Sequence, residues 1–345
     1  MSFHFAPGKY LKLFLFLILL SIAFAGGIYV RNDKVLWQSL RTPLKNIYNW
    51  RKTIKNFQWD QKFELVKIQM SDQVQKAYFF KSTTSKKQPL LVSLHTWNGD
   101  YSEYDPLAEL AAKKNINYIH PDFMGPNNRL QACCSSEVIE AIDKAIDYAI
   151  SHADVDPSKI YITGASGGGY ATLCMLMRSK HSIDKFSAWV PVTDLEAWYY
   201  ENIVRNGNFS HDILECTGSG TTIDSTSAAE RSPLKWHPEN TTNLNKAEIA
   251  IYTGIYDGVQ GSVPITHSIN FYNKLLHEKK VLDESLFIND SEKAFLLEKR
   301  AALDTFGKIA DRKVLLKKES ENIKILIFEG GHEMLYSYNF KVLIN

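Results

Sequence analysis

From about residue 60 onward, short apolar runs alternate with stretches of helical periodicity. Residues 89–94 and 116–119 are nearly continuous apolar runs, as expected for strands that are covered on both faces. In residues 136–152, apolar positions recur along one helical stripe, and Ser135 or Ser136 supplies a cap at its start. Strands and helices in alternation imply crossover connections and a mostly parallel sheet. The pattern therefore predicts an α/β fold with helices on both faces of a central sheet.

Two long segments interrupt this alternation. Further strands are predicted over 63–69, 75–81, 159–163, 186–190, 248–252 and 323–328, and further helices over 104–114, 170–180 and 266–280. Residues 203–246 lie between two of these strands, and an insertion after the carboxyl end of a strand overhangs the ligand crevice of an α/β sheet. We expect this segment to be lid-like. Residues 282–318 are charged, with helical periodicity near 294–301, and are expected to form a peripheral helical insertion.

The N-terminus carries an uncharged apolar run over residues 13–30, preceded by Lys9 and Lys12. Residues 1–30 are therefore expected to be a signal peptide, cleaved after Ala25, or a retained membrane anchor. Seven Lys and Arg residues follow the apolar run, and positive residues prefer the cytoplasmic side, which argues against export of the domain. The small-x-small cleavage pattern Ala23-Phe24-Ala25 carries more weight. We interpret 31–58 as a basic linker and 59–345 as one catalytic domain. A cleaved signal peptide and a retained anchor both place that domain outside the cytoplasm. The anchor would also attach it to the membrane.

Composition narrows the function classes. The 345 residues carry a net charge of +2, which gives no reason to expect a nucleic-acid partner. The four cysteines, Cys133, Cys134, Cys174 and Cys216, have no spacing typical of a zinc or redox site. Four buried thiols are the preferred interpretation, and a disulfide between Cys216 and Cys133 or Cys134 is the alternative if the chain is exported. No metal site and no cofactor are indicated.

Ser166 is the candidate nucleophile. It lies in the segment Gly164-Ala-Ser-Gly-Gly168, between a predicted strand and a predicted helix. This is the G-x-S-x-G elbow in the strand-turn-helix context that it requires. The flanking glycines permit a sharp turn, and the free N–H groups of the helix N-terminus point at the attacking oxygen.

A serine hydroxyl needs a base, and the base needs an orienting acid. In this type of fold the acid and then the histidine follow the serine in the chain, each beyond a later strand. Asp257 follows the strand at 248–252, and His332 follows the strand at 323–328 after two glycines. We therefore predict Ser166 as nucleophile, His332 as general base and Asp257 as the acid that orients it.

The tetrahedral oxyanion needs two hydrogen-bond donors. The backbone N–H of Gly167, directly after the nucleophile, is the first candidate. The second is expected from the loop after the strand at 89–94. There we choose the N–H of Trp97, with Thr96 as the second choice.

These motifs resemble the catalytic domain of the prolyl oligopeptidase-like branch of α/β hydrolases, which includes acetyl xylan esterases. The resemblance covers about 88–338 and rests on the elbow, on Gly254-Ile-Tyr-Asp257 continuing to Val263-Pro264, and on Gly330-Gly-His-Glu333. It implies an α/β-hydrolase fold and serine hydrolase chemistry. His95-Thr96-Trp97 departs from the His-Gly-Gly pattern frequent at that place, which bears on the second oxyanion donor.

Two substrate classes remain. Fewer than 90 residues precede the hydrolase segment and contain no propeller repeat, which favours a carboxylic-ester hydrolase that works through an acyl-enzyme. Small-molecule or polysaccharide esters are the expected substrates. The alternative is a serine peptidase of the prolyl oligopeptidase-like type acting on short peptides, and a non-catalytic binding protein is a further alternative. Five aromatic residues are candidates for a pocket wall: Trp97, Trp189, Trp198, Tyr199 and Tyr200.

Overall fold

The computed structural model describes residues 58–345. The predicted signal peptide or anchor at 1–30 and nearly all of the linker at 31–58 lie outside the described residues. Residues 59–345 form one compact unit. Between residues 58 and 345, no helix combines the length and apolarity needed to cross a membrane.

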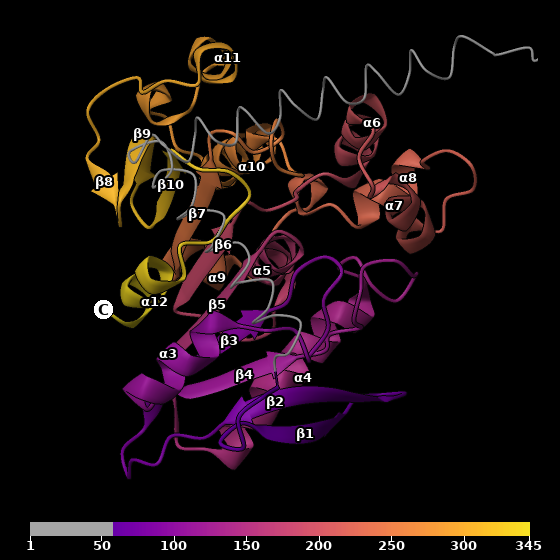
Figure 1. Cartoon of the computed structure of the whole chain (residues 1–345), viewed down its shortest axis with the longest axis vertical. Coiled ribbons are helices and arrows are strands. Elements are labelled where there is room, and N and C mark those ends of the chain that lie inside the picture. Colours follow the sequence, from indigo (N-terminus) through magenta and orange to yellow (C-terminus); the bar gives the residue numbers. More distant parts are fainter. Residues whose placement is uncertain (1–57) are drawn as a thin grey trace, which may run out of the picture. The chain divides into compact units, whose positions relative to one another are not determined.

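A twisted sheet of ten strands forms the centre of the described unit (Figure 1). Its order is β1-β2-β4-β3-β5-β6-β7-β10-β9-β8, and the strands from β4 to β10 run parallel. The antiparallel strands lie at both edges. The strands are β1 Glu64–Gln69, β2 Val74–Phe80, β3 Gln88–Leu94, β4 Asn117–Pro121, β5 Val155–Ala165, β6 Lys185–Trp189, β7 Glu248–Gly254, β8 Lys308–Ile309, β9 Arg312–Ser320 and β10 Ile323–Phe328.

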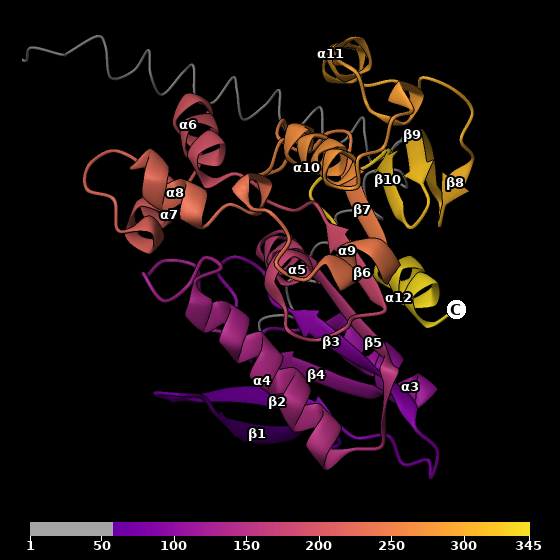
Figure 2. The same ribbon diagram turned by 180° about the vertical axis from the view of Figure 1, so that it is seen from behind.

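Helices cover both faces of the sheet. Helices α4, α5 and α10 pack on one face, and α3 and α12 pack on the other (Figures 1 and 2). The helices are α3 Pro106–Lys114, α4 Ser136–His152, α5 Gly167–Arg178, α6 Leu195–Arg205, α7 Ser210–Thr217, α8 Ser225–Glu230, α9 Thr241–Lys246, α10 Ile265–Glu278, α11 Asp290–Lys299 and α12 Tyr336–Ile344, with short 3-10 turns at Pro233–Lys235 and Glu284–Leu286. The predicted mostly parallel sheet with helices on both faces is confirmed.

Local chemistry accounts for the best-predicted elements. Leu90, Leu91 and Val92 are fully buried in β3, which has side chains against both helix layers. Helix α4 begins after Ser135, whose hydroxyl accepts a hydrogen bond from the Val138 N–H, 3.2 Å away. Its apolar stripe packs into the core, so that the helix keeps its predicted bounds.

Strand register brings the predicted site loops to one edge. Phe328, the last residue of β10, pairs with Gly254, the last residue of β7. The loops that carry Asp257 and His332 therefore leave the sheet at the same level. Hydrogen bonds between the ends of β5, β6 and β7 continue this edge: Ser166 N–H donates to Trp189 O, and Val190 N–H donates to Tyr252 O.

The interpretation of 282–318 as only a peripheral helix is wrong. The segment contains α11, but it also contains β8 and β9, and β9 pairs antiparallel with β10 along its length. The buried apolar part of β9 is its centre, Val314 to Leu316, and charged residues flank it on both sides. A strand near a sheet edge tolerates those charges, so no apolar alternation marks it in the sequence. Helix α12 was also absent from the predicted elements.

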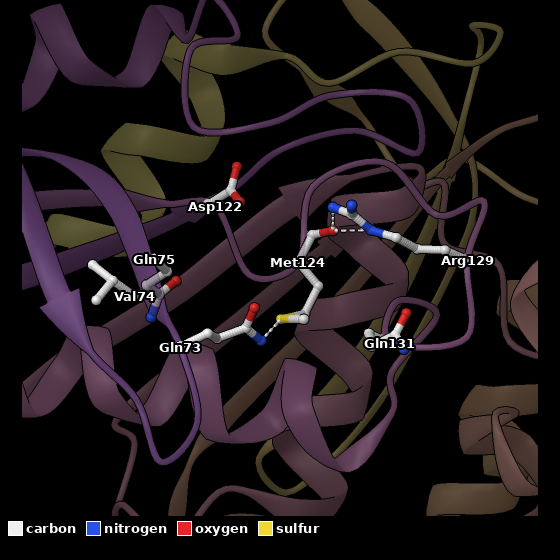
Figure 3. Close-up of a pocket in the computed structure, with 7 residues that line it drawn as sticks. All are labelled: Gln73, Val74, Gln75, Asp122, Met124, Arg129 and Gln131. Atoms are coloured by element: carbon white, nitrogen blue, oxygen red, sulfur yellow. Dashed lines mark hydrogen bonds between the residues drawn. The ribbon is translucent and has the colours of Figure 1, made fainter.

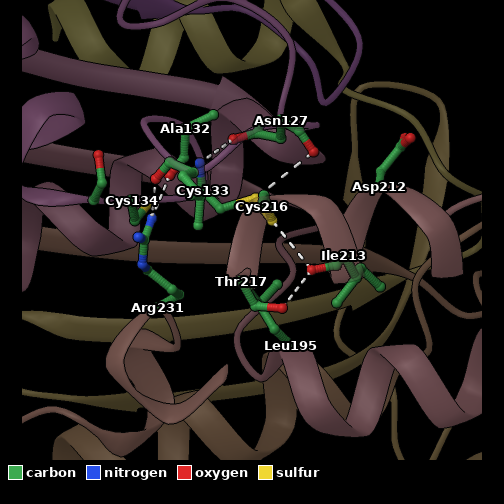
Figure 4. Close-up of a disulfide and its surroundings, with 12 residues drawn as sticks. Asn127, Ala132, Cys133, Cys134, Leu195, Asp212, Ile213, Cys216, Thr217 and Arg231 are labelled. Atoms are coloured by element: carbon green, nitrogen blue, oxygen red, sulfur yellow. Dashed lines mark hydrogen bonds between the residues drawn. A yellow bond between two sulfur atoms is a disulfide. The ribbon is translucent and has the colours of Figure 1, made fainter. Parts of the chain in front are cut away.

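All four cysteines form disulfides, so the preferred interpretation of four free thiols is wrong. Cys133 pairs with Cys216, one of the two alternatives (Figure 4), and Cys134 pairs with Cys174. The adjacent cysteines thereby connect one loop to α7 of the 203–246 segment and to α5. Sequence spacing could not show these pairs, because tertiary packing brings the partners together across 83 and 40 residues.

The inserted segment 203–246 is packed against the hydrophobic core. Ile213, Trp236 and Leu244 belong to the same buried cluster as the helices on that face of the sheet. Its role as a lid remains a prediction.

Candidate active site

Ser166 lies at the turn between β5 and α5, as the elbow motif predicts. Its backbone has φ 57° and ψ −117°, outside the regions that ordinary residues occupy. Such strain persists only where the surroundings fix it, and it concentrates at functional sites. The Ser166 N–H donates to Trp189 O at 2.9 Å, and Ser166 O accepts from the Tyr170 N–H at 2.8 Å. The backbone of the predicted nucleophile is therefore held on both sides, and the residue is partly exposed.

Asp257 and His332, from different loops, are in direct contact. Nδ1 of His332 lies 2.7 Å from Oδ2 of Asp257. The aspartate side chain has no exposed surface, whereas the histidine side chain is 21% exposed. Oδ1 of Asp257 accepts from the N–H groups of Gly258, at 2.9 Å, and Val263, at 3.0 Å. A buried carboxylate with these donors orients the ring and leaves Nε2 available for proton transfer.

Within residues 58–345, no hydrogen bond joins the Ser166 hydroxyl to His332. In the absence of substrate, the hydrogen bond between nucleophile and base is frequently long and tightens only in the substrate complex. The structure thus forms the acid–base half of the predicted triad and sets the serine at the same edge of the sheet.

Trp97 lies directly against the elbow. A Cβ atom placed on Gly167 would be 2.4 Å from the backbone nitrogen of Trp97. The Gly167 N–H is at the first position of a helix, where no intrahelical acceptor exists. The Thr96 N–H, by contrast, donates to Oε2 of Glu103 at 2.7 Å, so it is already engaged. This geometry favours Trp97 over Thr96 as the second oxyanion donor.

The Trp97 loop is held in place by residues that sequence analysis did not identify. The Asn127 backbone N–H donates to Trp97 O at 2.9 Å, and Oδ1 of Asn127 accepts from the Cys133 N–H at 2.7 Å. Nε1 of Trp97 donates to Oδ2 of Asp212, a residue of α7, at 3.2 Å. Asn127 and Asp212 appear among the labelled residues around the disulfide in Figure 4. No sequence motif marks these two polar residues, because only the tertiary fold brings them close to the Trp97 loop.

Two ionisable groups beside this loop have shifted pKa values. Burial lowers the pKa of the His95 imidazole and so favours its neutral form, whereas its hydrogen bonds to the Thr96 and Asp122 carbonyls oppose this shift. A neutral ring has one N–H, which it can give to Thr96 O, 2.9 Å from Nδ1, or to Asp122 O, 2.8 Å from Nε2. Burial raises the pKa of the Asp212 carboxyl, and the hydrogen bond from Trp97 partly offsets this increase.

The five predicted aromatic residues do not form one wall. Trp97 and Trp198 are in edge-to-face contact, with ring centroids 4.7 Å apart. Trp189 is instead stacked on Tyr252 in the core on the α3 and α12 side of the sheet. Only Tyr200, 53% exposed, presents a large surface to solvent. Most of these rings therefore stabilise the core, because large aromatic side chains contribute most when they are buried.

A polar pocket of about 290 Å³ lies away from the predicted catalytic residues (Figure 3). Its lining residues are Gln73, Val74, Gln75, Asp122, Met124, Arg129 and Gln131. Part of its polar surface is already used internally, since Arg129 donates to Met124 O and Gln73 contacts the Met124 sulfur. No cluster of three His, Cys, Asp or Glu residues suited to a metal ion exists among residues 58–345.

Three solved structures show the fold to which this chain is similar. The acylaminoacyl peptidase of Pyrococcus horikoshii matches with a TM-score of 0.56 and 15% identity, over 86% of this chain and 42% of its own. An acylaminoacyl peptidase in complex with Z-Gly-Gly-Phe-chloromethyl ketone matches with a TM-score of 0.56 and 16% identity, over 81% and 40%. Prolyl oligopeptidase B from Galerina marginata matches with 0.51 and 16%, over 64% and 32%. The chain thus spans less than half the length of each, and the likeness establishes the α/β-hydrolase fold.

The family is established by sequence. A comparison with curated proteins found no match. The profile of the prolyl oligopeptidase family, Peptidase_S9, matches residues 107–293, which include the elbow and the Asp257 loop. This match confirms the resemblance inferred from the motifs. Since it covers more than half of the sequence, the chain belongs to the prolyl oligopeptidase family of serine hydrolases.

Proposed function

We propose that this protein is a serine peptidase that cleaves short peptides or N-acylated aminoacyl substrates. The family match carries the proposal, and the similar solved structures are named as acylaminoacyl and prolyl peptidases. The preference for esters drawn from sequence length is not supported by these findings, which fit the peptidase alternative better.

The proposed chemistry uses the residues described above. Ser166 Oγ attacks the scissile carbonyl while Nε2 of His332 takes its proton. The backbone N–H groups of Gly167 and Trp97 stabilise the oxyanion. The protonated imidazole, held by Asp257 at 2.7 Å, then gives its proton to the leaving amine. Water attacks the resulting acyl-enzyme by the same route, releasing the acid and restoring the serine.

The test compares matched amide and ester substrates. Purified protein is given acyl-aminoacyl and prolyl amides of a fluorogenic amine, together with p-nitrophenyl esters of the same acyl groups. Since amides are intrinsically much less reactive than these esters, the proposal requires measurable amide turnover that is lost in Ser166→Ala. Ester turnover with no amide turnover across the panel would refute the peptidase proposal and restore the ester-hydrolase alternative.

We further propose that the domain works outside the cytoplasm. Its two disulfides engage all four cysteines, and disulfides persist mainly in oxidising compartments. The apolar run at 13–30 supports export or membrane attachment. Thiol labelling of fractionated cells after acid quenching and denaturation without reductant tests this proposal, because all four cysteines are buried in the folded protein. Four labelled cysteines in a cytoplasmic fraction would contradict it.

A further inference from the structure

Arg205, the last residue of α6, contacts the loop that carries Asp257. We name residues 257–263 the acid loop. The Arg205 guanidinium donates to three carbonyls of this loop: Gly258 O at 3.3 Å, Gly261 O at 3.3 Å and Ser262 O at 3.0 Å. A planar guanidinium presents its donors in a fixed fork, so it holds these three peptides in one relative arrangement.

The backbone that Arg205 holds lies directly against Asp257 and His332. A Cβ atom on Gly261 would be 2.3 Å from Oδ1 of Asp257 and 2.6 Å from Cβ of His332. Oδ1 of Asp257 also depends on the acid loop for its two backbone donors. A displacement of Gly261 would therefore move the carboxylate relative to the imidazole.

Helix α6 is itself well anchored, so Arg205 has a rigid base. Nε1 of Trp198, two turns earlier, donates to Ser262 O at 2.9 Å. Oε2 of Glu201 lies 3.0 Å from Nε2 of the buried His267 in α10. Nε of Arg205 donates to Glu201 O at 3.1 Å, which fixes the side chain along its own helix.

The outer side of the acid loop is exposed to solvent. Val259 is 63% exposed, so little apolar packing fixes this part of the loop. Hydrogen bonds from Arg205 and Trp198 of α6 hold the loop there, together with the backbone bonds that the Val259 and Gln260 N–H groups donate to Tyr256 O.

We propose that Arg205 is a positioning residue, which holds the acid loop so that Asp257 stays aligned with His332. The proposal rests on the proposed function, because that function assigns the acid and the base. Arg205 itself touches neither residue's side chain by hydrogen bond and acts through the backbone of the acid loop.

The decisive variant is Arg205→Met, which keeps an unbranched apolar stem and removes the guanidinium donors. A misplacement of about 1 Å in a catalytic group can cost about 10²-fold, so we expect kcat to fall about 10- to 100-fold. KM should change little, because the acid loop aligns the base and not the substrate. Arg205→Lys keeps the charge but loses the fork and should fall between wild type and Arg205→Met.

Arg231→Met is the matched control. Nη1 of Arg231 also donates to backbone carbonyls, those of Leu130 and Ala132, at 2.8 Å each, but it does not contact the acid loop. Its kcat should stay near that of wild type, even if its unfolding midpoint falls as far as that of Arg205→Met. Equal losses of kcat in the two variants would overturn the proposal, since they would reflect general destabilisation.

A spectroscopic measurement separates this proposal from the proposed function. The proton between Nδ1 of His332 and Asp257 should give a far-downfield ¹H resonance, assigned by its loss in Asp257→Asn. We expect this signal to broaden or shift upfield in folded Arg205→Met and to remain in Arg231→Met. An unchanged signal in Arg205→Met would overturn the positioning role, whereas failure of wild type to react with a fluorophosphonate at Ser166 would overturn the serine hydrolase assignment instead.

Discussion

Gly167→Ala tests the oxyanion site by a steric perturbation, since a backbone donor cannot be deleted. The new Cβ would lie 2.4 Å from the Trp97 nitrogen and 2.5 Å from its Cα, where ordinary contacts begin near 3.4 Å. Both obstacles are backbone atoms, so no side-chain rotation relieves the overlap. One of the two segments must therefore move by about 1 Å, a displacement that can cost about 10²-fold in rate.

We expect kcat of Gly167→Ala to fall about 10²- to 10³-fold, the loss seen when one oxyanion donor is removed. Stability should fall by about 1–3 kcal/mol, because the added methyl group overpacks the site. The assay is steady-state turnover of an amide and an ester substrate, with urea denaturation to show that the variant is folded. Gly220→Ala, with open space around its new methyl group, is the control and should keep both properties.

Unchanged turnover in folded Gly167→Ala would refute the reasoning. It would mean that Trp97 and Gly167 do not form the oxyanion site, or that the loop moves without consequence for the transition state.

Three further predictions follow from the same geometry. Ser166→Ala should lower kcat by about 10⁶, and Asp257→Asn by about 10⁴, measured as amide turnover; residual rates above a tenth of wild type would contradict both roles. Replacing Cys133 and Cys216 together by serine should lower the free energy of unfolding in urea by about 4–5 kcal/mol, since the bridge spans 83 residues; an unchanged unfolding free energy would disprove this contribution. Because burial raises the pKa of Asp212, folding disfavours its ionised form, so the stability of wild type relative to Asp212→Asn should be highest at acid pH. That stability difference should decline as the pH rises through the raised pKa and then level off. Thermal unfolding of both proteins from pH 3 to 7 measures it. A stability difference that grows with pH would contradict the raised pKa of Asp212.

The catalytic candidates were accessible from sequence because each has a local signature. Ser166 lies in a glycine-rich turn between a strand and a helix, and Asp257 and His332 follow buried apolar runs in the expected order. In a parallel sheet, the carboxyl ends of strands share one edge, so order along the chain predicts proximity in space. The contact of 2.7 Å between Asp257 and His332 agrees with that expectation.

Interactions without a local signature could not be predicted in this way. Strand β9 is marked by charges and not by apolar alternation, because it lies near the sheet edge. The choice between Trp97 and Thr96 depends on Glu103, whose carboxylate occupies the Thr96 N–H. Neither the charged strand nor that hydrogen bond leaves a periodic pattern in the sequence.

The sequence by itself determined the fold class, the family and the order of the reactive residues, because those follow from periodicity and short motifs. Only the tertiary structure decided which cysteines pair, which donors the Trp97 loop leaves free, and that Arg205 grips the acid loop. The physical reason is that hydrogen bonds and disulfides between distant segments depend on a few ångströms of relative placement. Packing of the whole core sets that placement, and no short stretch of the chain encodes it.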